Sequence, residues 1–126
     1  MWTYKQSTGE LFRDGRCHAR GYSGREWGKN NAAAQVVPGI GPIPKGRWRM
    51  TAIEDSHNVG PRTIILHAVD ATPGDDRHDA TGRGAFRIHG DSIRNPGGAS
   101  HGCIVLPRSI RLAMWQSGDR DLEVVS

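Results

Sequence analysis

Two segments near the middle of the chain decide the fold class: Trp48-Arg49-Met50-Thr51-Ala52-Ile53, followed by Thr63-Ile64-Ile65-Leu66-His67-Ala68-Val69. The first alternates between apolar and polar side chains, which is typical of a strand with one buried face. The second is a short apolar run rich in β-branched residues, which favours a buried strand. Gly60-Pro61 stands between them and predicts the turn that separates the two strands. We therefore expect the two strands to pair.

Further short strands are predicted on both sides of this pair. Residues 2–5 and 10–13 indicate an opening hairpin around Ser7-Thr8-Gly9, because glycine supplies the positive φ that tight turns need. Residues 85–89 alternate as a strand that ends at Gly90, residues 103–106 form a short apolar run, and residues 121–125 close the chain as a strand. Most of the regular structure is therefore expected to be β.

One short helix is predicted over residues 107–115. Pro107 fits a first helical position, the apolar residues Ile110, Ala113 and Met114 share one face, and Gly118 follows the last turn. Residues 21–44 read as a long loop with one helical turn near residues 31–35, and residues 70–84 as a polar surface loop. The predicted fold class is mainly β: curved sheets or a β-sandwich with one short helix.

Composition narrows the class of protein. A chain of 126 residues has the usual size of one domain, so we expect a single domain over residues 1–126. No apolar stretch approaches the roughly 18 residues that cross a bilayer, so no membrane span is expected. The net charge of +4 favours polyanionic partners such as the carboxylate-rich bacterial wall, whereas the dispersed arginines and the lack of a nucleic-acid motif argue against nucleic acid.

The chemistry is concentrated in Ile88-His89-Gly90-Asp91-Ser92 and Ser100-His101-Gly102-Cys103. A histidine at the end of one strand and a cysteine at the start of another are joined by a loop that can bring them together. An ordinary thiol is mostly protonated at neutral pH, with a pKa of about 8.5, so a nucleophilic cysteine needs a base or cation nearby. This pattern predicts Cys103 as the nucleophile and His89 as its base, with backbone N–H groups around Gly102 as a possible oxyanion hole.

Other interpretations of the same residues stay open. Cys103 alone can be a small buried hydrophobe, and a histidine that ends a strand is often structural. A zinc site built from His67, His89, His101 and Cys103 would make the protein a metal-dependent amidase, although the spacing lacks the close ligand pairs of known zinc motifs. The positive charge also suits a noncatalytic module that binds the bacterial cell wall. With two cysteines, Cys17 and Cys103, a disulfide scaffold is not expected.

The segment from His89-Gly90 to Ser100-His101-Gly102-Cys103 resembles the catalytic signature of the L,D-transpeptidase (YkuD-like) family. Three further stretches, Gly21-Tyr22-Ser23-Gly24, Lys29-Asn30-Asn31 and Gly41-Pro42-Ile43-Pro44-Lys45-Gly46, are similar to those of L,D-transpeptidase-like toxins delivered by type VI secretion. The final Leu122-Glu123-Val124 strand adds to this resemblance, which covers nearly the whole chain.

The resemblance implies a peptidoglycan-modifying enzyme without a cofactor or metal. Cys103 would attack the stem tetrapeptide and release its terminal D-alanine, and a thioester would then pass to water or to another D-amino acid. It implies His101 as a further catalytic residue, which would either orient the substrate or support the Cys103 loop. The expected substrate-binding residues are Ser100, Gly102, Gly90, Asp91, Ser92, Tyr22 and Ser23, with a hydrogen bond inside the Cys103 loop as the alternative role of Ser100.

Two departures and the start of the chain refine this expectation. The His89 to Cys103 loop is shorter than is usual in housekeeping L,D-transpeptidases, and Val105 stands where those enzymes commonly place Arg or Asn. Cleavage or exchange is therefore expected over cross-linking. The first residues lack a secretory signal, so we expect a monomeric effector injected into the periplasm of a target bacterium, with an immunity protein and the secretion apparatus as partners.

Overall fold

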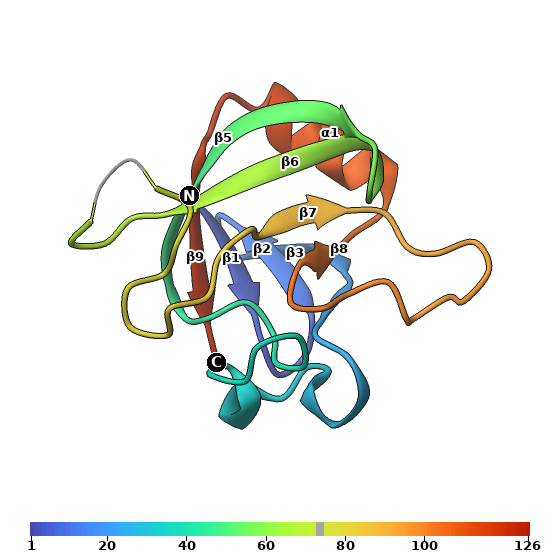
Figure 1. Cartoon of the computed structure of the whole chain (residues 1–126). Helices are drawn as coiled ribbons and strands as arrows, with labels where there is room; N and C mark the ends of the chain where they lie inside the picture. The colour runs from blue at the N-terminus through green and yellow to red at the C-terminus, as the bar shows by residue number, and fades with distance from the viewer. Residues whose placement is uncertain (73–74) are drawn as a thin grey trace.

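A computed structural model of the chain describes residues 1–72 and 75–126. Within them, nine strands form one mixed sheet, accompanied by one α-helix and two 3-10 turns (Figure 1). The strands are β1 (Trp2–Lys5), β2 (Glu10–Arg13), β3 (Arg16–Arg20), β4 (Tyr22–Ser23), β5 (Gly46–Ser56), β6 (Gly60–Ala68), β7 (Arg87–His89), β8 (Ile104–Val105) and β9 (Asp121–Val125). The predicted mainly β class with one short helix is confirmed.

The predicted pair in the middle of the chain is the long antiparallel hairpin β5–β6, in which Trp48 is paired with Ala68. Both strands run further than expected, and the turn was placed wrongly. Gly60 and Pro61 belong to β6, and Gly60 pairs with Ser56. Gly60 has a φ of +104°, which only glycine adopts easily, so it starts the returning strand directly after the turn.

The sheet curls so that its two edges meet. Its strand order is β3-β2-β1-β9-β5-β6-β7-β8-β4, so the edge strands β3 and β4 are neighbours in the sequence with one residue, Gly21, between them. The amide of Gly21 donates to the carbonyl of Gly9, 2.8 Å away. A side chain at Gly21 would collide with the carbonyl oxygen of Val105, at 1.8 Å. Glycine is therefore required where the chain passes from one edge of the sheet to the other.

Alternate side chains of the strands form the hydrophobic core. Trp48 and Met50 on β5, like Ile64 and Leu66 on β6, are buried at every second position, as expected for strands with one face turned inward. Their partners in this core come from β1, β2, β7, β8, β9 and the helix: Trp2, Tyr4, Leu11, Ile88, Ile104, Met114, Leu122 and Val124. The core fixes the positions of β7 and β8, on which the candidate site is built.

The predicted helix is α1 (Arg108–Gln116), and Pro107 directly precedes its first residue. It lies beside β6 and β7 (Figure 1). The helical turn expected near residues 31–35 is η2 (Ala32–Ala34), whereas η1 (Glu26–Gly28) and strands β3 and β4 had not been predicted. Of the predicted loop over residues 70–84, residues 73–74 lie outside the described residues, and the rest forms turns and bends.

Candidate functional site

Strands β7 and β8 bring the two ends of the sequence motif side by side. They pair in parallel, with Ile88 opposite Ile104 and His89 opposite Val105. Cys103, one residue before β8, therefore stands at the level of Arg87, and His89 lies two positions further along the neighbouring strand. Successive side chains of a strand point to opposite faces, so Arg87 and His89 share one face of β7.

Cys103 is partly exposed, and its sulfur lies against the backbone that leads into β7. Its thiol donates to the carbonyl oxygen of Ala85, with 3.8 Å between sulfur and oxygen. Burial raises the pKa of the Cys103 thiol, while the backbone N–H of Arg87 and the charges of Arg87 and Arg83 act to lower it. Because burial has the largest effect, the resting form of Cys103 is the neutral thiol.

His89 is buried, and its ring is held in one tautomer. Nδ1 lies 2.8 Å from the carbonyl oxygen of Gly90, an acceptor, so Nδ1 carries the proton and Nε2 is the basic nitrogen. Burial lowers the pKa of His89; Arg111 also lowers it, while the hydrogen bond to Gly90 and the charge of Asp91 raise it. In the described part of the chain no hydrogen bond joins His89 to Cys103. Such contacts are often long in unliganded enzymes and tighten when substrate binds.

Ser100 and Ser23 hold the loop that carries Cys103. Ser100 Oγ donates to the Cys103 carbonyl (2.5 Å) and accepts from the amides of Gly24 (2.9 Å) and Gly102 (3.0 Å). Ser23 Oγ donates to the carbonyl of Gly102 (2.7 Å) and accepts from the amide of Ile43 (2.8 Å). Both serines are fully buried, so in this structure their hydroxyl groups serve to hold the loop.

Gly102 is required both by its conformation and by its surroundings. Its φ of +142° disfavours any side chain, and an added Cβ would lie 2.5 Å from Nη2 of Arg83 and 2.9 Å from the ring of Phe86. Its amide already donates to Ser100, so the N–H of Gly102 is not free to stabilise an oxyanion in this structure.

Arg83 connects two loops directly beside Cys103. Its guanidinium is buried and donates to four carbonyl oxygens at 2.7–3.3 Å: those of Gln35, Gly41, Pro42 and His101. It also lies over the Phe86 ring, 5.0 Å from the centroid. Burial lowers the pKa of Arg83, whereas the negative charge of a Cys103 thiolate would raise it. Arg83 therefore supplies a fixed positive charge next to the sulfur.

Two cavities open at opposite ends of the β7–β8 pair. The smaller, which we call the thiol cavity, has a volume of about 350 Å³ and is lined by Pro38, Gly39, Thr81, Gly82, Arg83, Gly84, Ala85, Phe86, His101, Gly102 and Cys103. His101 is exposed there and shares the cavity with the sulfur, whereas His89 does not line it. The structure thus presents two histidines near Cys103, one buried in the neighbouring strand and one at the surface.

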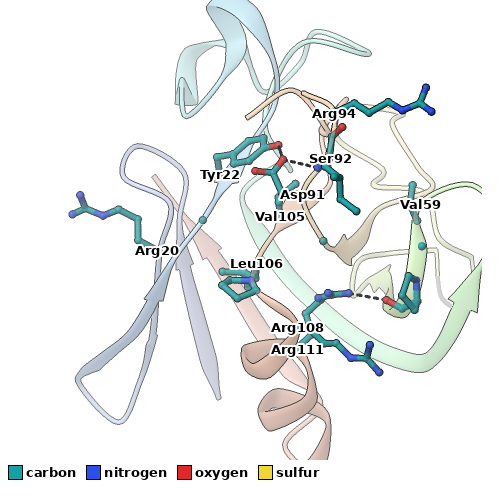
Figure 2. Close-up of a pocket in the computed structure, with 16 residues that line it drawn as sticks. Arg20, Tyr22, Val59, Asp91, Ser92, Arg94, Val105, Leu106, Arg108 and Arg111 are labelled. Atoms are coloured by element: carbon teal, nitrogen blue, oxygen red, sulfur yellow. Dashed lines mark hydrogen bonds between the residues drawn. The ribbon is translucent and has the colours of Figure 1, made fainter. Parts of the chain in front are cut away.

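The larger cavity, which we call the arginine cavity, has a volume of about 630 Å³. Its lining includes four of the predicted binding residues, Gly90, Asp91, Ser92 and Tyr22, together with Arg20, Arg94, Arg108 and Arg111. Asp91 accepts from the Tyr22 hydroxyl (2.6 Å) and from the amide of Ser92 (Figure 2), and it also accepts from the amide of Gly97. Burial, and to a smaller extent the hydrogen bond with Asp91, raises the pKa of Tyr22 to about 12. The carboxylate of Asp91 is thus occupied in holding the loop after β7.

The described residues contain no group of three or more His, Cys, Asp or Glu side chains arranged to hold a metal ion. Cys17 and Cys103 are both free thiols, and Cys17 is exposed on β3. None of the described helices is long and apolar enough to cross a membrane.

Sequence reasoning missed three arginines that shape this site. Arg83 and Arg87 act on the Cys103 thiol, and Arg111 acts on His89. Arg83 and Arg111 are buried without a carboxylate partner among the described residues, and nothing in the sequence distinguishes Arg83 from the arginines at the surface. Arg111 gave one weak signal, because it occupies the apolar side of the predicted helix close to Ile110 and Met114.

Comparison with known proteins assigns the family. No curated protein and no solved structure matches the chain. The Tlde1 domain, the domain of L,D-transpeptidase-like effectors of type VI secretion, matches residues 18–125 and therefore spans both cavities and the whole His89 to Cys103 segment. Membership of this family indicates that the protein is a secreted effector enzyme that modifies the peptidoglycan of a target cell. The chain belongs to the Tlde1 domain family.

Proposed function

We propose that the protein is a cysteine-dependent L,D-carboxypeptidase and D-amino-acid exchange enzyme that acts on the peptidoglycan stem tetrapeptide. The observation that carries this proposal is a partly exposed thiol that opens into a cavity lined by the buried Arg83. The charge of Arg87 also acts on this thiol, and the neighbouring strand carries a histidine whose pKa is lowered by burial. Membership of an L,D-transpeptidase-like effector family supplies the substrate class.

The first half of the reaction releases D-alanine. Nε2 of His89 accepts the thiol proton as Cys103 Sγ attacks the carbonyl carbon before the terminal D-alanine, and the positive charges of Arg83 and Arg87 stabilise the sulfur as it ionises. The carbon–nitrogen bond then breaks, and the imidazolium gives its proton to the leaving amine. The products are free D-alanine and a thioester between Cys103 and the shortened stem peptide.

The second half transfers the acyl group. His89 takes a proton from water, or from the ammonium of a D-amino acid, and the resulting nucleophile attacks the thioester and restores the thiol. Water as acceptor gives carboxypeptidase activity, and a D-amino acid gives exchange. Val105 is apolar and faces the arginine cavity instead of offering a polar group to a second stem peptide, which favours these outcomes over cross-linking.

The neutral resting state defines how the thiol is activated. A raised thiol pKa and a lowered histidine pKa favour the uncharged pair over a preformed thiolate–imidazolium pair. Proton transfer therefore accompanies attack, and the sulfur stays protonated between turnovers.

The test is the release of D-alanine from purified disaccharide tetrapeptide, measured for the wild type, Cys103→Ala and Cys17→Ala. Cys17 is a second free thiol in the same chain, so it is the matched control for nonspecific sulfur chemistry. We expect release to fall to background in Cys103→Ala and to stay at the wild-type rate in Cys17→Ala. Activity that survives in Cys103→Ala and is lost with a chelator would instead favour a metal-dependent amidase, and binding to sacculi without any product would favour a noncatalytic module.

A further inference from the structure

Arg111 is a buried cation whose hydrogen-bonding capacity is largely unused. The residue is 4% exposed. Its Nη1 donates to the carbonyl oxygen of Pro61 (2.8 Å; Figure 2) and to that of Arg62 (3.0 Å), both on β6. Neither Nε nor Nη2 donates a hydrogen bond within the described residues, and Nε is fully buried. A buried guanidinium without a carboxylate partner is costly, so a ligand that supplies negative charge is the natural partner.

The free end of Arg111 lies at the wall of the arginine cavity. Nη2 would be 3.0 Å from a Cβ on Gly90, so it lies against the backbone directly after His89. Glycine at this position leaves the approach to Nη2 open. Arg108, one turn earlier on α1, lines the same cavity and is exposed.

Charge in the cavity favours an anion. Among the described residues, Asp91 is the only acidic residue that lines the cavity, and its carboxylate already accepts hydrogen bonds from the Tyr22 hydroxyl and from the amides of Ser92 and Gly97. Arg20 and Arg94 extend away from the centre of the cavity (Figure 2), whereas Arg111 lies at its wall, and Arg108 on the same helix adds a second positive charge to the lining. Burial lowers the pKa of Arg111, and repulsion by the charge of Arg108 lowers it further. A bound anion would relieve this repulsion.

From these observations we infer that the arginine cavity binds a carboxylate of the peptide substrate, anchored by Nη2 of Arg111 and assisted by Arg108. This inference rests on the proposed function, because it requires a peptide that reaches Cys103. Val105, on the cavity wall, is two residues beyond Cys103, which corresponds to roughly 7 Å along a strand. A peptide with a carboxylate about two residues away from the attacked bond spans this interval. The site thereby selects acidic stem peptides.

The decisive experiment measures binding in a Cys103→Ala background, in which turnover does not interfere. The probes are the disaccharide tetrapeptide and the same compound with its internal carboxylates converted to amides. The variants are Arg111→Lys, which keeps the charge but loses the planar fork, and Arg108→Gln, which alters an exposed residue. Arg16→Gln removes an exposed positive charge outside the cavity and is the matched control.

We expect Arg111→Lys and Arg108→Gln to weaken binding of the free-carboxylate peptide by about tenfold, because each change removes or distorts a charged hydrogen bond to the carboxylate. The amidated peptide should bind the parent about tenfold more weakly, and the two variants should weaken it little further. Arg16→Gln should bind both peptides like the parent.

Equal weakening of both peptides by the variants, or no weakening of either, would overturn the inference. Thermal unfolding of Arg111→Lys shows whether its loss of binding is a loss of fold, and Arg108→Gln keeps the test valid in that case. A separate assay with intact Cys103 distinguishes the two proposals. D-alanine release at the wild-type rate in both arginine variants contradicts only the carboxylate site, whereas no release by the wild type contradicts the proposed function.

Discussion

The two ends of the β7–β8 pair each hold a buried arginine, but the two guanidinium groups are used differently. At the thiol cavity, both terminal nitrogens of Arg83 donate to backbone carbonyls of the two loops that enclose Cys103. At the arginine cavity, Arg111 donates through Nη1 alone. Arg83 is therefore part of the framework and acts on the sulfur through its charge, whereas Arg111 keeps N–H groups for a ligand.

This difference places chemistry at one end and recognition at the other. Around Cys103, the side chains of Ser23, Ser100 and Arg83 are hydrogen-bonded within the protein, which fixes the loop that carries the nucleophile. At the other end, Nη2 of Arg111 donates no hydrogen bond within the described residues. His89 lies between the two ends. Burial lowers the pKa of His89, and the charge of Arg111 lowers it further.

The largest effect on catalysis is expected when the two histidines near Cys103 are replaced one at a time. His89→Asn keeps a donor for the Gly90 carbonyl but removes the base, so kcat should fall by about 10²–10⁴-fold. His101→Asn, the matched change at the exposed histidine of the thiol cavity, should cost less than about tenfold. Steady-state D-alanine release measures both, and the reverse order would assign the base to His101.

A second large effect is expected at Arg83. Arg83→Met leaves four carbonyl oxygens without their donor and should lower the free energy of unfolding by about 2–4 kcal/mol. Arg87→Met should cost less than about 1.5 kcal/mol, because that guanidinium makes one backbone hydrogen bond. Both changes should raise the pKa of Cys103, seen as a shift of thiol alkylation toward higher pH.

Urea unfolding of the two variants gives the comparison directly. If Arg83→Met were as stable as Arg87→Met, the framework role of Arg83 would be wrong. If alkylation of Cys103 kept its pH dependence in both, neither charge would act on the sulfur.

A smaller loss is expected from Gly102→Ala. Alanine at this position would hold a disfavoured backbone conformation, and its Cβ would collide with Arg83. We therefore expect the free energy of unfolding to fall by about 1–3 kcal/mol and the acylation of Cys103 to slow. Gly15→Ala is the control, because Gly15 has a φ of +76° but no neighbouring atom within 4 Å of a new Cβ. Chemical denaturation should show Gly102→Ala to be the more damaging change; equal losses would leave backbone conformation as the whole cause.

The mildest expected effect is on the pH profile. Activity needs neutral His89, and burial lowers its pKa below the ordinary value of about 6.5, so the acid limb of kcat/KM should lie below pH 6.5. Above that limb, activity should stay constant until other groups titrate. Arg111→Lys keeps the positive charge and should leave the limb in place. An acid limb above pH 6.5 in the wild type contradicts a buried, neutral base.

The strands that cross the core could be predicted from the sequence, because burial of one face imposes alternation on residues such as Trp48 and Met50. Helix α1 was predicted for a similar reason, from its first-turn proline and its apolar side. The turn at Gly60 was misplaced because its glycine starts the returning strand instead of filling the turn. Strand β4 escaped notice because it is two residues long and both are buried by contacts distant in sequence.

The motif identified Cys103 and His89 as candidates, but several of the side chains that surround and hold them come from other parts of the chain. The alternative role expected for Ser100, a hydrogen bond within the Cys103 loop, is found in the structure, and Ser23 holds the same loop; substrate binding by either serine stays a prediction. The arginines that act on the site come from outside the motif or lie beside it in strand β7. Sequence spacing carries no information about partners so distant in the chain, so Arg83 could not be predicted, and Arg111 was marked only by its place on the apolar side of the helix.

The most direct test of the central claim is the mass of the intact protein, quenched in acid during turnover of the disaccharide tetrapeptide. The account predicts a covalent adduct equal to the tetrapeptide compound without its terminal D-alanine, mapped to Cys103 and present equally in Cys17→Ala. The adduct should be absent from Cys103→Ala. Release of D-alanine with no adduct at any stage, or an adduct on Cys17, would contradict Cys103 as the nucleophile.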